Sequence, residues 1–326
     1  MPLSVASRLS RCSVHYDRLV ERFALGCGNF GGVGSAPELF GRGLTRDQAF
    51  AVMDAAWELG ITAFDTADAY GGGRSERMIG EWIGARGVRP TITTKTFNPM
   101  DAGDSHGLAP ERVERQLRSS LDRLGVDRVD LYLAHAYDET VPLAETLGAF
   151  EAARDQGLIG TYGVSNFDVA RLGEALAAGS PRAVQNNYSL LEVADRDCLL
   201  PLCAINDLAF QAFSPLAGGW LTGKYRRGEA FPTGSRMTQR PEPYDRYRND
   251  RTFCFLEKLE AFAAGRGVSV ASLALAWLLA DERVTTIVLG PGRPEHLAPA
   301  REAMANPLSE DEQMAIEQIL VDEAAA

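Results

Sequence analysis

The sequence of 326 residues is 45% hydrophobic and 24% charged, a composition that supplies enough apolar side chains for a sizeable core. Its 44 acidic and 33 basic residues leave a formal net charge of −11. This acidic balance argues against a nucleic acid or an anionic membrane as a partner, because both attract basic patches. The length fits about two average domains, but a single barrel domain also reaches this size.

Two further features bear on the cellular compartment. The longest apolar run, at 268–280, is too short to span a bilayer. The first residues, MPLSVASRLSRCSV, lack the continuous apolar run of a signal peptide. We therefore expect a cytoplasmic protein with no membrane partner.

The five cysteines match neither a zinc-site nor a redox-motif spacing and are expected to be reduced thiols: Cys12, Cys27, Cys198, Cys203 and Cys254.

Short apolar or β-branched runs alternate with helical stretches along the chain. The runs predict buried strands at 23–26, 63–66, 91–96, 131–134, 160–165, 183–186, 210–214 and 285–289. Helices are predicted at 45–60, 75–87, 110–125, 142–157, 168–179, 255–267 and 268–281. Thr45 and Gln48 match a capping box at the start of the first helix, and most of these helices end on glycine, as the first does at Gly60.

This alternation, without an intervening linker, predicts a closed parallel (β/α)8 barrel as one domain over residues 1–326, with a C-terminal helix or tail at 307–326. The competing fold is an open doubly wound sheet, which normally has a glycine-rich phosphate turn after its first strand. Gly26, Gly28 and Gly31 approach that pattern, but Pro37 and further glycines precede the next helix. The barrel is therefore the favoured fold.

One connecting segment, 217–250, is too long for a plain connector. It is rich in Gly, Pro, Arg and Tyr. Long ordered loops in compact domains usually carry function, whereas the alternative interpretation is a disordered insertion.

Polar residues follow three successive predicted strands. In a barrel these strand ends face the mouth of the active site. Asp65 ends the second strand, Tyr70 lies five residues later, Lys95 is near the end of the third strand, and His135 follows the fourth. Charged groups at the ends of apolar strands are expected to share a partly desolvated pocket. The other histidines, His15, His106 and His296, give no catalytic indication from their positions.

These four residue types make a general acid. A nearby Lys95 ammonium is expected to lower the pKa of Tyr70, and Asp65 would hold that ammonium in place. A neutral His135 imidazole would orient a carbonyl group or relay the proton. Tyr70 would then protonate a carbonyl oxygen while another species supplies hydride. Because no side chain donates hydride, a nicotinamide cofactor is implied.

At this point the chain resembles the aldo-keto reductases, in particular the branch with bacterial reductases and potassium-channel β subunits. The resemblance spans about residues 25–300 and is carried by these segments: LGCGNFGG, GITAFDTADAYGGGRSE, TTK, LDRLGVDRVDLYLAH, GVSNF, VQNNYSLL, AFSPLAGGWLTGKY and VLGPGRPEHL. It implies a (β/α)8 barrel in which Asp65, Tyr70, Lys95 and His135 form the catalytic tetrad, with Tyr70 as the acid.

The resemblance also implies a cofactor site. The nicotinamide end would be lined by Gly28, Asn29, Asp65, Ser165, Asn166, Gln185 and Phe213, where Phe213 replaces the family's usual tyrosine. A strap would close over the pyrophosphate through Ser214, Leu216, Gly218 and Lys224, which explains the long 217–250 loop as a clasp. The adenosine end would use Gly290, Arg293 and His296. It departs from the family pattern at Gly292, His296, Pro299 and Ala300. NADPH is favoured because Arg293 can pair with a 2′-phosphate, and NAD is the alternative.

Several residues on the mouth loops are candidate substrate contacts beside the tetrad. These are Phe30, Tyr70, Phe97, Asn98, His135, Tyr137 and Trp220, although loop packing is an equally good interpretation of each aromatic. The leading function is an NADPH-dependent carbonyl reductase acting on a small-molecule aldehyde or ketone. The alternatives are a nicotinamide-binding regulatory subunit and a non-redox barrel enzyme, and for the latter no metal cluster or phosphate loop is visible in the sequence. A homo-oligomer, a tetramer or larger, is expected from the resemblance.

Overall fold

The computed structural model describes residues 21–325, with side chains to residue 321. Cys12, His15 and the segment considered for a signal peptide lie outside the described residues. The remaining cysteines, Cys27, Cys198, Cys203 and Cys254, are free thiols, as predicted for these four.

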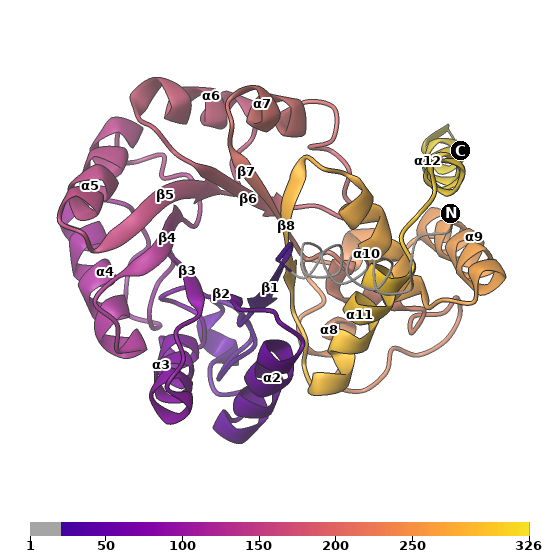
Figure 1. The fold of residues 1–326 in the computed structure, drawn as a ribbon, viewed down its shortest axis with the longest axis horizontal. Helices are drawn as coiled ribbons and strands as arrows, with labels where there is room; N and C mark the ends of the chain where they lie inside the picture. The colour runs from indigo at the N-terminus through magenta and orange to yellow at the C-terminus, as the bar shows by residue number, and fades with distance from the viewer. Residues whose placement is uncertain (1–20, 326) are drawn as a thin grey trace, which may run out of the picture.

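Eight parallel strands close into a barrel in which each strand pairs with the next and β8 pairs with β1 (Figure 1). The fold is therefore a (β/α)8 barrel, as the alternation of elements predicted. The strands are β1 (Phe23–Gly26), β2 (Ala63–Asp65), β3 (Thr91–Thr96), β4 (Val129–Ala134), β5 (Ile159–Ser165), β6 (Ala183–Asn187), β7 (Ala209–Phe213) and β8 (Val284–Leu289).

Helices surround the barrel (Figure 1). They are α2 (Arg46–Glu58), α3 (Arg74–Arg86), α4 (Pro110–Leu124), α5 (Leu143–Asp155), α6 (Val169–Ala178), α7 (Leu199–Ile205), α9 (Asp250–Arg266) and α10 (Val270–Ala280). The prediction missed α7, which is short and has no side-chain cap to mark its start. It also began α9 five residues late, because the Asn249 side chain accepts the Thr252 N–H and starts the helix earlier.

The C-terminal part adds η4 (Pro294–Leu297), α11 (Ala298–Ala305) and α12 (Glu310–Ala325), and a short η1 (Pro37–Leu39) lies in the β1–α2 connection. The helix α12, predicted as a C-terminal helix or tail, packs against α9. In the part of the chain that the structure describes, no single helix has the length and apolarity needed to cross a membrane. Taken together, α9 and α10 would meet that test, but they are bent by 89° to each other.

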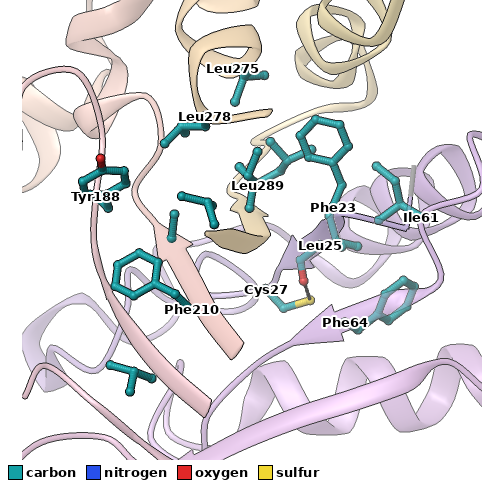
Figure 2. Close-up of a cluster of buried hydrophobic side chains, with 14 of the residues drawn as sticks. Phe23, Leu25, Cys27, Ile61, Phe64, Tyr188, Phe210, Leu275, Leu278 and Leu289 are labelled. Carbon is teal, nitrogen blue, oxygen red and sulfur yellow. Dashed lines mark hydrogen bonds between the residues drawn. The ribbon is translucent and has the colours of Figure 1, made fainter. Parts of the chain in front are cut away.

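Most of the core lies between the outer face of the barrel and the helices. Figure 2 shows one part of it, where side chains from several strands meet α10: Phe23, Leu25, Cys27, Ile61, Phe64, Tyr188, Phe210, Leu275, Leu278 and Leu289. A separate apolar cluster joins Leu131 and Leu133 of β4 to Ala183 of β6. Because β5 lies between these two strands, this contact crosses the barrel interior. Gly163 on β5 leaves room for this contact, since a Cβ at Gly163 would come within 2.9 Å of the Leu133 side chain.

The long segment 217–250 is folded around one aromatic side chain. It contains η2 (Ala217–Thr222), α8 (Arg236–Gln239) and η3 (Asp245–Tyr247). Trp220 is wholly buried and makes ring contacts with Tyr225, Phe231, Tyr247 and Phe253 at centroid distances of 5.1–6.1 Å. The segment therefore has its own small core, which disagrees with the disordered-insertion interpretation.

The loop between β2 and α3 carries Tyr70 and is held from two sides. Ser75 Oγ donates to the Cys27 carbonyl oxygen at 2.9 Å, and the Asp68 backbone N–H donates to the Lys95 carbonyl oxygen at 3.0 Å. These bonds tie the loop to the ends of β1 and β3. The position of Tyr70 relative to Lys95 is thereby determined by main-chain and hydroxyl contacts.

Asp68 belongs to this loop, and its side chain is wholly buried. Its ionisation therefore links the packing of the loop to pH. Burial, reinforced by the Glu76 carboxylate, raises the pKa of Asp68 to about 7, while Thr96 and Arg123 act in the opposite direction. An aspartate in the unfolded chain has a pKa of about 3.9. The folded protein therefore binds a proton more tightly, and the free energy of unfolding falls as the pH rises from about 4 to about 7.

Replacing this ionisable group tests the linkage. Asp68→Asn keeps the neutral form at every pH, so we expect the variant to be more stable than the parent at pH 8 and the difference to shrink toward pH 5. Urea unfolding at both pH values measures this difference. Asp127→Asn, an exposed position, is the matched control and should show no such dependence. An Asp68→Asn variant less stable than the parent at pH 8 would contradict the assignment.

Candidate active site

The four predicted tetrad residues meet at the C-terminal mouth of the barrel. Asp65 is the last residue of β2, Lys95 is the fifth residue of β3, His135 follows the last residue of β4, and Tyr70 lies in the turn after β2. Parallel strands that are neighbours in the barrel bring these positions together, since β2 pairs with β3 and β3 with β4. This is the arrangement that the strand ends predicted.

A buried ion pair forms the floor of the site. Lys95 Nζ donates to Asp65 Oδ1 at 2.6 Å and to the Thr66 carbonyl oxygen at 2.9 Å. The Lys95 side chain is completely buried, and that of Asp65 is 6% exposed. Burial by itself would lower the pKa of Lys95, but Asp65 and Tyr70 outweigh it and the pKa is raised. The ammonium therefore stays charged at the bottom of the pocket.

Tyr70 lies above this pair, and Lys95 Nζ is 5.3 Å from the centre of its ring. Burial raises the pKa of Tyr70, and Lys95 opposes that rise without reversing it. The expectation that Lys95 brings the pKa below its ordinary value is therefore wrong for this structure, because desolvation of the phenolate is the larger effect. Tyr70 keeps its proton at neutral pH, with a cation beneath it to stabilise the phenolate once the proton has left.

His135 meets Tyr70 edge to face, with ring centres 5.5 Å apart. Burial lowers the pKa of His135 to about 3, and the positive charge of Lys95 acts in the same direction. The imidazole is therefore neutral throughout the physiological range, as predicted. Its Nδ1 lies 3.1 Å from Nδ2 of Asn98, which is on the loop after β3.

A chain of amides extends this floor across the barrel. Gln185 Nε2 donates to Asp65 Oδ2 at 2.7 Å and to Gln211 Oε1 at 2.9 Å. Both amide hydrogens of Gln185 are thus used within the protein. Gln211 was missed by sequence reasoning, and the available signal was its position on β7 two residues before Phe213, on the same face of the strand.

The residues assigned to the nicotinamide lie together at the ends of β5 to β7. Ser165 Oγ donates to the Gln185 carbonyl oxygen at 2.8 Å, and Asn166 Nδ2 donates to the His135 carbonyl oxygen at 2.8 Å. Asn166 and Ser214 have left-handed backbone conformations, with φ of 61° and 58°. Such conformations in residues other than glycine are concentrated at functional sites.

The loop after β1 contributes Gly28 and Asn29. A Cβ at Gly28 would be 3.4 Å from the Tyr70 ring, so a larger residue would crowd the phenol. Asn29 Nδ2 donates to the Pro291 carbonyl oxygen at 2.9 Å and joins this loop to the one after β8. Its Oδ1 is buried and has no partner among the described residues. A ligand with a donor group, such as a ribose hydroxyl, would satisfy this oxygen.

Cationic side chains gather where the clasp meets the loop after β8. Lys224 lies over the Tyr225 ring at 5.1 Å. Burial lowers the pKa of Lys224, and the charges of Arg236 and Arg293 lower it further. Arg236, from α8, was not among the predicted residues, because only the fold of the clasp brings it here. This convergence of like charges fits an anionic group such as a pyrophosphate.

His296 belongs to the same cluster. Its Nδ1 accepts the Gly292 N–H at 3.1 Å. Burial lowers its pKa, and Arg293 and Lys224 lower it further. A Cβ at Gly290 would meet nothing within 4 Å, so the backbone there is open to a ligand.

The clasp itself is closely packed over this region. Leu216 is partly buried beside Gly218. A Cβ at Gly218 would lie 2.5 Å from the Tyr244 ring, which explains the glycine. The residues present therefore fit a bound dinucleotide, through the unsatisfied Asn29 Oδ1 at one end of the site and the cluster of cations at the other.

The aromatic candidate substrate contacts outside the tetrad separate into two groups. Phe97 and Tyr137 are partly buried at the mouth. Phe97 packs on His106 with ring centres 5.1 Å apart, and the Tyr137 hydroxyl donates to Glu174 Oε2 at 2.9 Å. Phe30 and Trp220, by contrast, are wholly buried in the core. As placed they offer no surface to a substrate, so the structure disagrees with the substrate-contact interpretation of these two residues.

Comparisons with known proteins agree with this geometry. The model of the aldo/keto reductase family matches residues 23–321. Uncharacterized oxidoreductase YrpG of Bacillus subtilis (strain 168) is 33% identical over 298 residues, covering 85% of this chain and 85% of its own. The glycerol dehydrogenase AKR11B4 of Gluconobacter oxydans has a solved structure that superposes with a TM-score of 0.80 at 25% identity, covering 94% of this chain and 93% of its own.

Two other relatives have more specific names. NADH-specific methylglyoxal reductase of Escherichia coli (strain K12) is 29% identical, covering 86% of this chain and 89% of its own. Probable voltage-gated potassium channel subunit beta of Oryza sativa subsp. japonica is 31% identical, covering 77% of this chain and 80% of its own. The match along almost the whole barrel, together with the geometry of the site, shows that this chain belongs to the aldo/keto reductase family.

Proposed function

We propose that this oxidoreductase reduces an aldehyde or ketone to an alcohol with NADPH, and that Tyr70 is the general acid. The observation that carries the proposal is a protonated, half-buried phenol placed over the Lys95–Asp65 ion pair and beside the neutral His135. This grouping supplies a proton and then stabilises the negative charge that remains. Aldo-keto reductases use nicotinamide cofactors, and such a cofactor, when bound, supplies the hydride.

Each side chain has a distinct task in this proposal. Tyr70 donates its O–H proton to the carbonyl oxygen as that oxygen gains negative charge. Lys95 stabilises the phenolate that forms, and Asp65 holds the ammonium beneath it. His135 donates one N–H to the same oxygen and orients it. Alcohol oxidation uses the same groups in reverse, with the Tyr70 phenolate accepting the proton.

NADPH is proposed over NADH because of the cations at the clasp. Arg293 lies beside Lys224, and among the described residues its ion-pair partner is Glu295, at 3.7 Å. The 2′-phosphate of NADPH would give this exposed guanidinium a stronger bidentate partner. NADH is the alternative cofactor, because the E. coli relative is named as NADH-specific.

A regulatory nicotinamide-binding role is the second candidate, and the rice relative named as a channel subunit supports it. The complete set of acid, cation, carboxylate and imidazole favours turnover. A homo-oligomer stays a prediction. The discriminating measurement is NADPH oxidation, followed by absorbance, across a panel of aldehydes and ketones. Absence of turnover with tight NADPH binding would favour the regulatory role.

Removal of the acid is the most direct test. In Tyr70→Phe the ring and the cofactor site remain, but the proton donor is lost. We expect turnover to fall by roughly 10²–10⁴-fold, while the Kd for NADPH changes little. Steady-state kinetics and a fluorescence titration measure the two effects. Near-normal reduction at neutral pH would refute the role of Tyr70.

Lys95→Met separates catalysis from stability. Without the ammonium, the pKa of Tyr70 rises further and the phenolate loses its cation, so turnover should fall. Asp65 is left buried and unpaired, which should lower the free energy of unfolding by about 3–5 kcal/mol. In the double variant Asp65→Asn/Lys95→Met the buried charge is gone, so stability should partly return while turnover does not. An unchanged turnover in Lys95→Met would place Lys95 outside the chemistry.

The clasp residues test the cofactor assignment. Each lost charge-assisted contact should cost about 1.5–3 kcal/mol of binding, roughly ten- to a hundred-fold in Kd. Arg293→Ala should weaken NADPH and spare NADH, because NADH lacks the 2′-phosphate. Lys224→Ala should weaken both cofactors alike. Titrations of both variants with both cofactors decide this. Equal effects of Arg293→Ala on the two cofactors would reject the 2′-phosphate assignment.

A further inference from the structure

Asn98 makes the one hydrogen bond to the His135 ring that the described residues provide. Its Nδ2 lies 3.1 Å from His135 Nδ1. The ring is held from its backbone as well, since the His135 N–H donates to the Thr96 carbonyl oxygen at 2.9 Å and its carbonyl oxygen accepts from Asn166. The imidazole therefore has a defined position, with one ring nitrogen directed at an amide group.

The loop that carries Asn98 is anchored by a buried arginine. Arg112 Nη2 donates to the Asn98 carbonyl oxygen at 2.9 Å, and its guanidinium pairs with both carboxylate oxygens of Asp104 at 3.0 Å. Asp104 in turn accepts the Met100 N–H at 3.0 Å. This network lies within the loop and holds its main chain in place. The Asn98 amide is thus presented to His135 from a braced segment.

Hydrogen-bond polarity then determines where the ring proton is. An amide nitrogen donates and cannot accept, so Nδ1 of His135 must be the acceptor. A neutral imidazole has one proton, which is left on Nε2. The ring is neutral because burial and the Lys95 charge lower its pKa to about 3. Nε2 has no partner among the described residues, so its N–H is free for a ligand.

We infer that Asn98 is a positioning residue that holds His135 in the Nε2–H tautomer, so that His135 and Tyr70 both present donors to a single acceptor oxygen. The identity of that oxygen as a substrate carbonyl rests on the proposed function. The opposite tautomer would direct a lone pair at the same oxygen and repel it. Asn98 thereby makes the pocket selective for an acceptor, although it does not touch the reacting atoms.

Asn98→Asp is the sharpest variant because it keeps the size of the side chain and reverses the polarity. A carboxylate accepts a hydrogen bond, so the ring proton should move to Nδ1, and the negative charge should raise the pKa of His135. We expect turnover to fall at least roughly 10²-fold, as for loss of an acid–base group, with little change in the Kd for NADPH. The pH profile should gain an ionisation at a higher pH than in the parent.

Two further variants complete the design. Asn98→Ala removes the donor without adding a charge, so it should mix the two tautomers and lower turnover less than Asn98→Asp. If Asn98→Asp does not fold, Asn98→Ala still tests the inference. Asn206→Asp makes the same chemical change at an exposed position at the end of α7 and should leave both turnover and the His135 tautomer unchanged.

The tautomer of the His135 ring is the decisive measurement, because it would not change if Asn98 had only a structural role. In uniformly ¹⁵N-labelled full-length protein, long-range ¹H–¹⁵N spectra distinguish protonated from bare ring nitrogens, and His135→Gln identifies the His135 signals among the four histidines. We expect a bare Nδ1 and a protonated Nε2 at pH 7, with the pattern reversed in Asn98→Asp.

A protonated Nδ1 in the parent protein would overturn the inference, as would an Asn98→Asp variant with the parent's tautomer and turnover. Because the spectrum does not depend on turnover, the two proposals fail separately. An inactive parent with the expected tautomer would reject the carbonyl reductase and support the positioning of His135. An active parent with the opposite tautomer would support the carbonyl reductase and reject the positioning of His135.

Discussion

The candidate site depends on one buried ion pair, between Lys95 and Asp65. A lysine ammonium that is completely removed from water is tolerated only when opposite charge and hydrogen-bond acceptors replace its hydration. Asp65 and the Thr66 carbonyl oxygen provide these at 2.6 and 2.9 Å. The second carboxylate oxygen of Asp65 is bound by Gln185, so the pair is connected across the barrel. Because Tyr70 lies directly above Lys95, this pair determines which charge the phenol meets when it loses its proton.

Burial shifts the pKa values of Tyr70 and His135 in opposite directions, but in both cases it favours the neutral form. It raises the pKa of Tyr70 and lowers that of His135, so that both are neutral at physiological pH. Two neutral groups that each carry a proton suit a reaction in which negative charge develops on an oxygen. In the proposed reaction, Lys95 would offset the cost of desolvating the phenolate at the moment when that charge forms.

At the end of the site assigned to the cofactor phosphates, burial and repulsion between like charges act together. There, burial lowers the pKa of Lys224, and the nearby charges of Arg236 and Arg293 lower it further. Such a like-charge cluster is unfavourable without an anion, so the site is prepared for a phosphate-bearing ligand. Trp220 and its aromatic neighbours hold the clasp in a folded state, which lowers the ordering cost when such a ligand binds. In the proposed function, Trp220 would therefore support cofactor binding indirectly, since its ring is wholly buried.

The amino-acid sequence by itself determined the barrel and predicted which four polar residues meet at its mouth. Strand ends and hydrophobic periodicity are local patterns, and a barrel brings the ends of its strands to one mouth. The sequence did not determine α7, which lacks a start signal, or the burial of Trp220, which depends on rings distant along the chain. Only the tertiary structure decided that desolvation outweighs Lys95 at Tyr70 and that Asn98, expected on the mouth loops, contacts the His135 ring. It also brought Gln211 and Arg236 to the site. Those facts depend on how deeply each group is buried and on which neighbours the folded loops bring within a few ångströms, and neither is encoded in any short stretch of sequence.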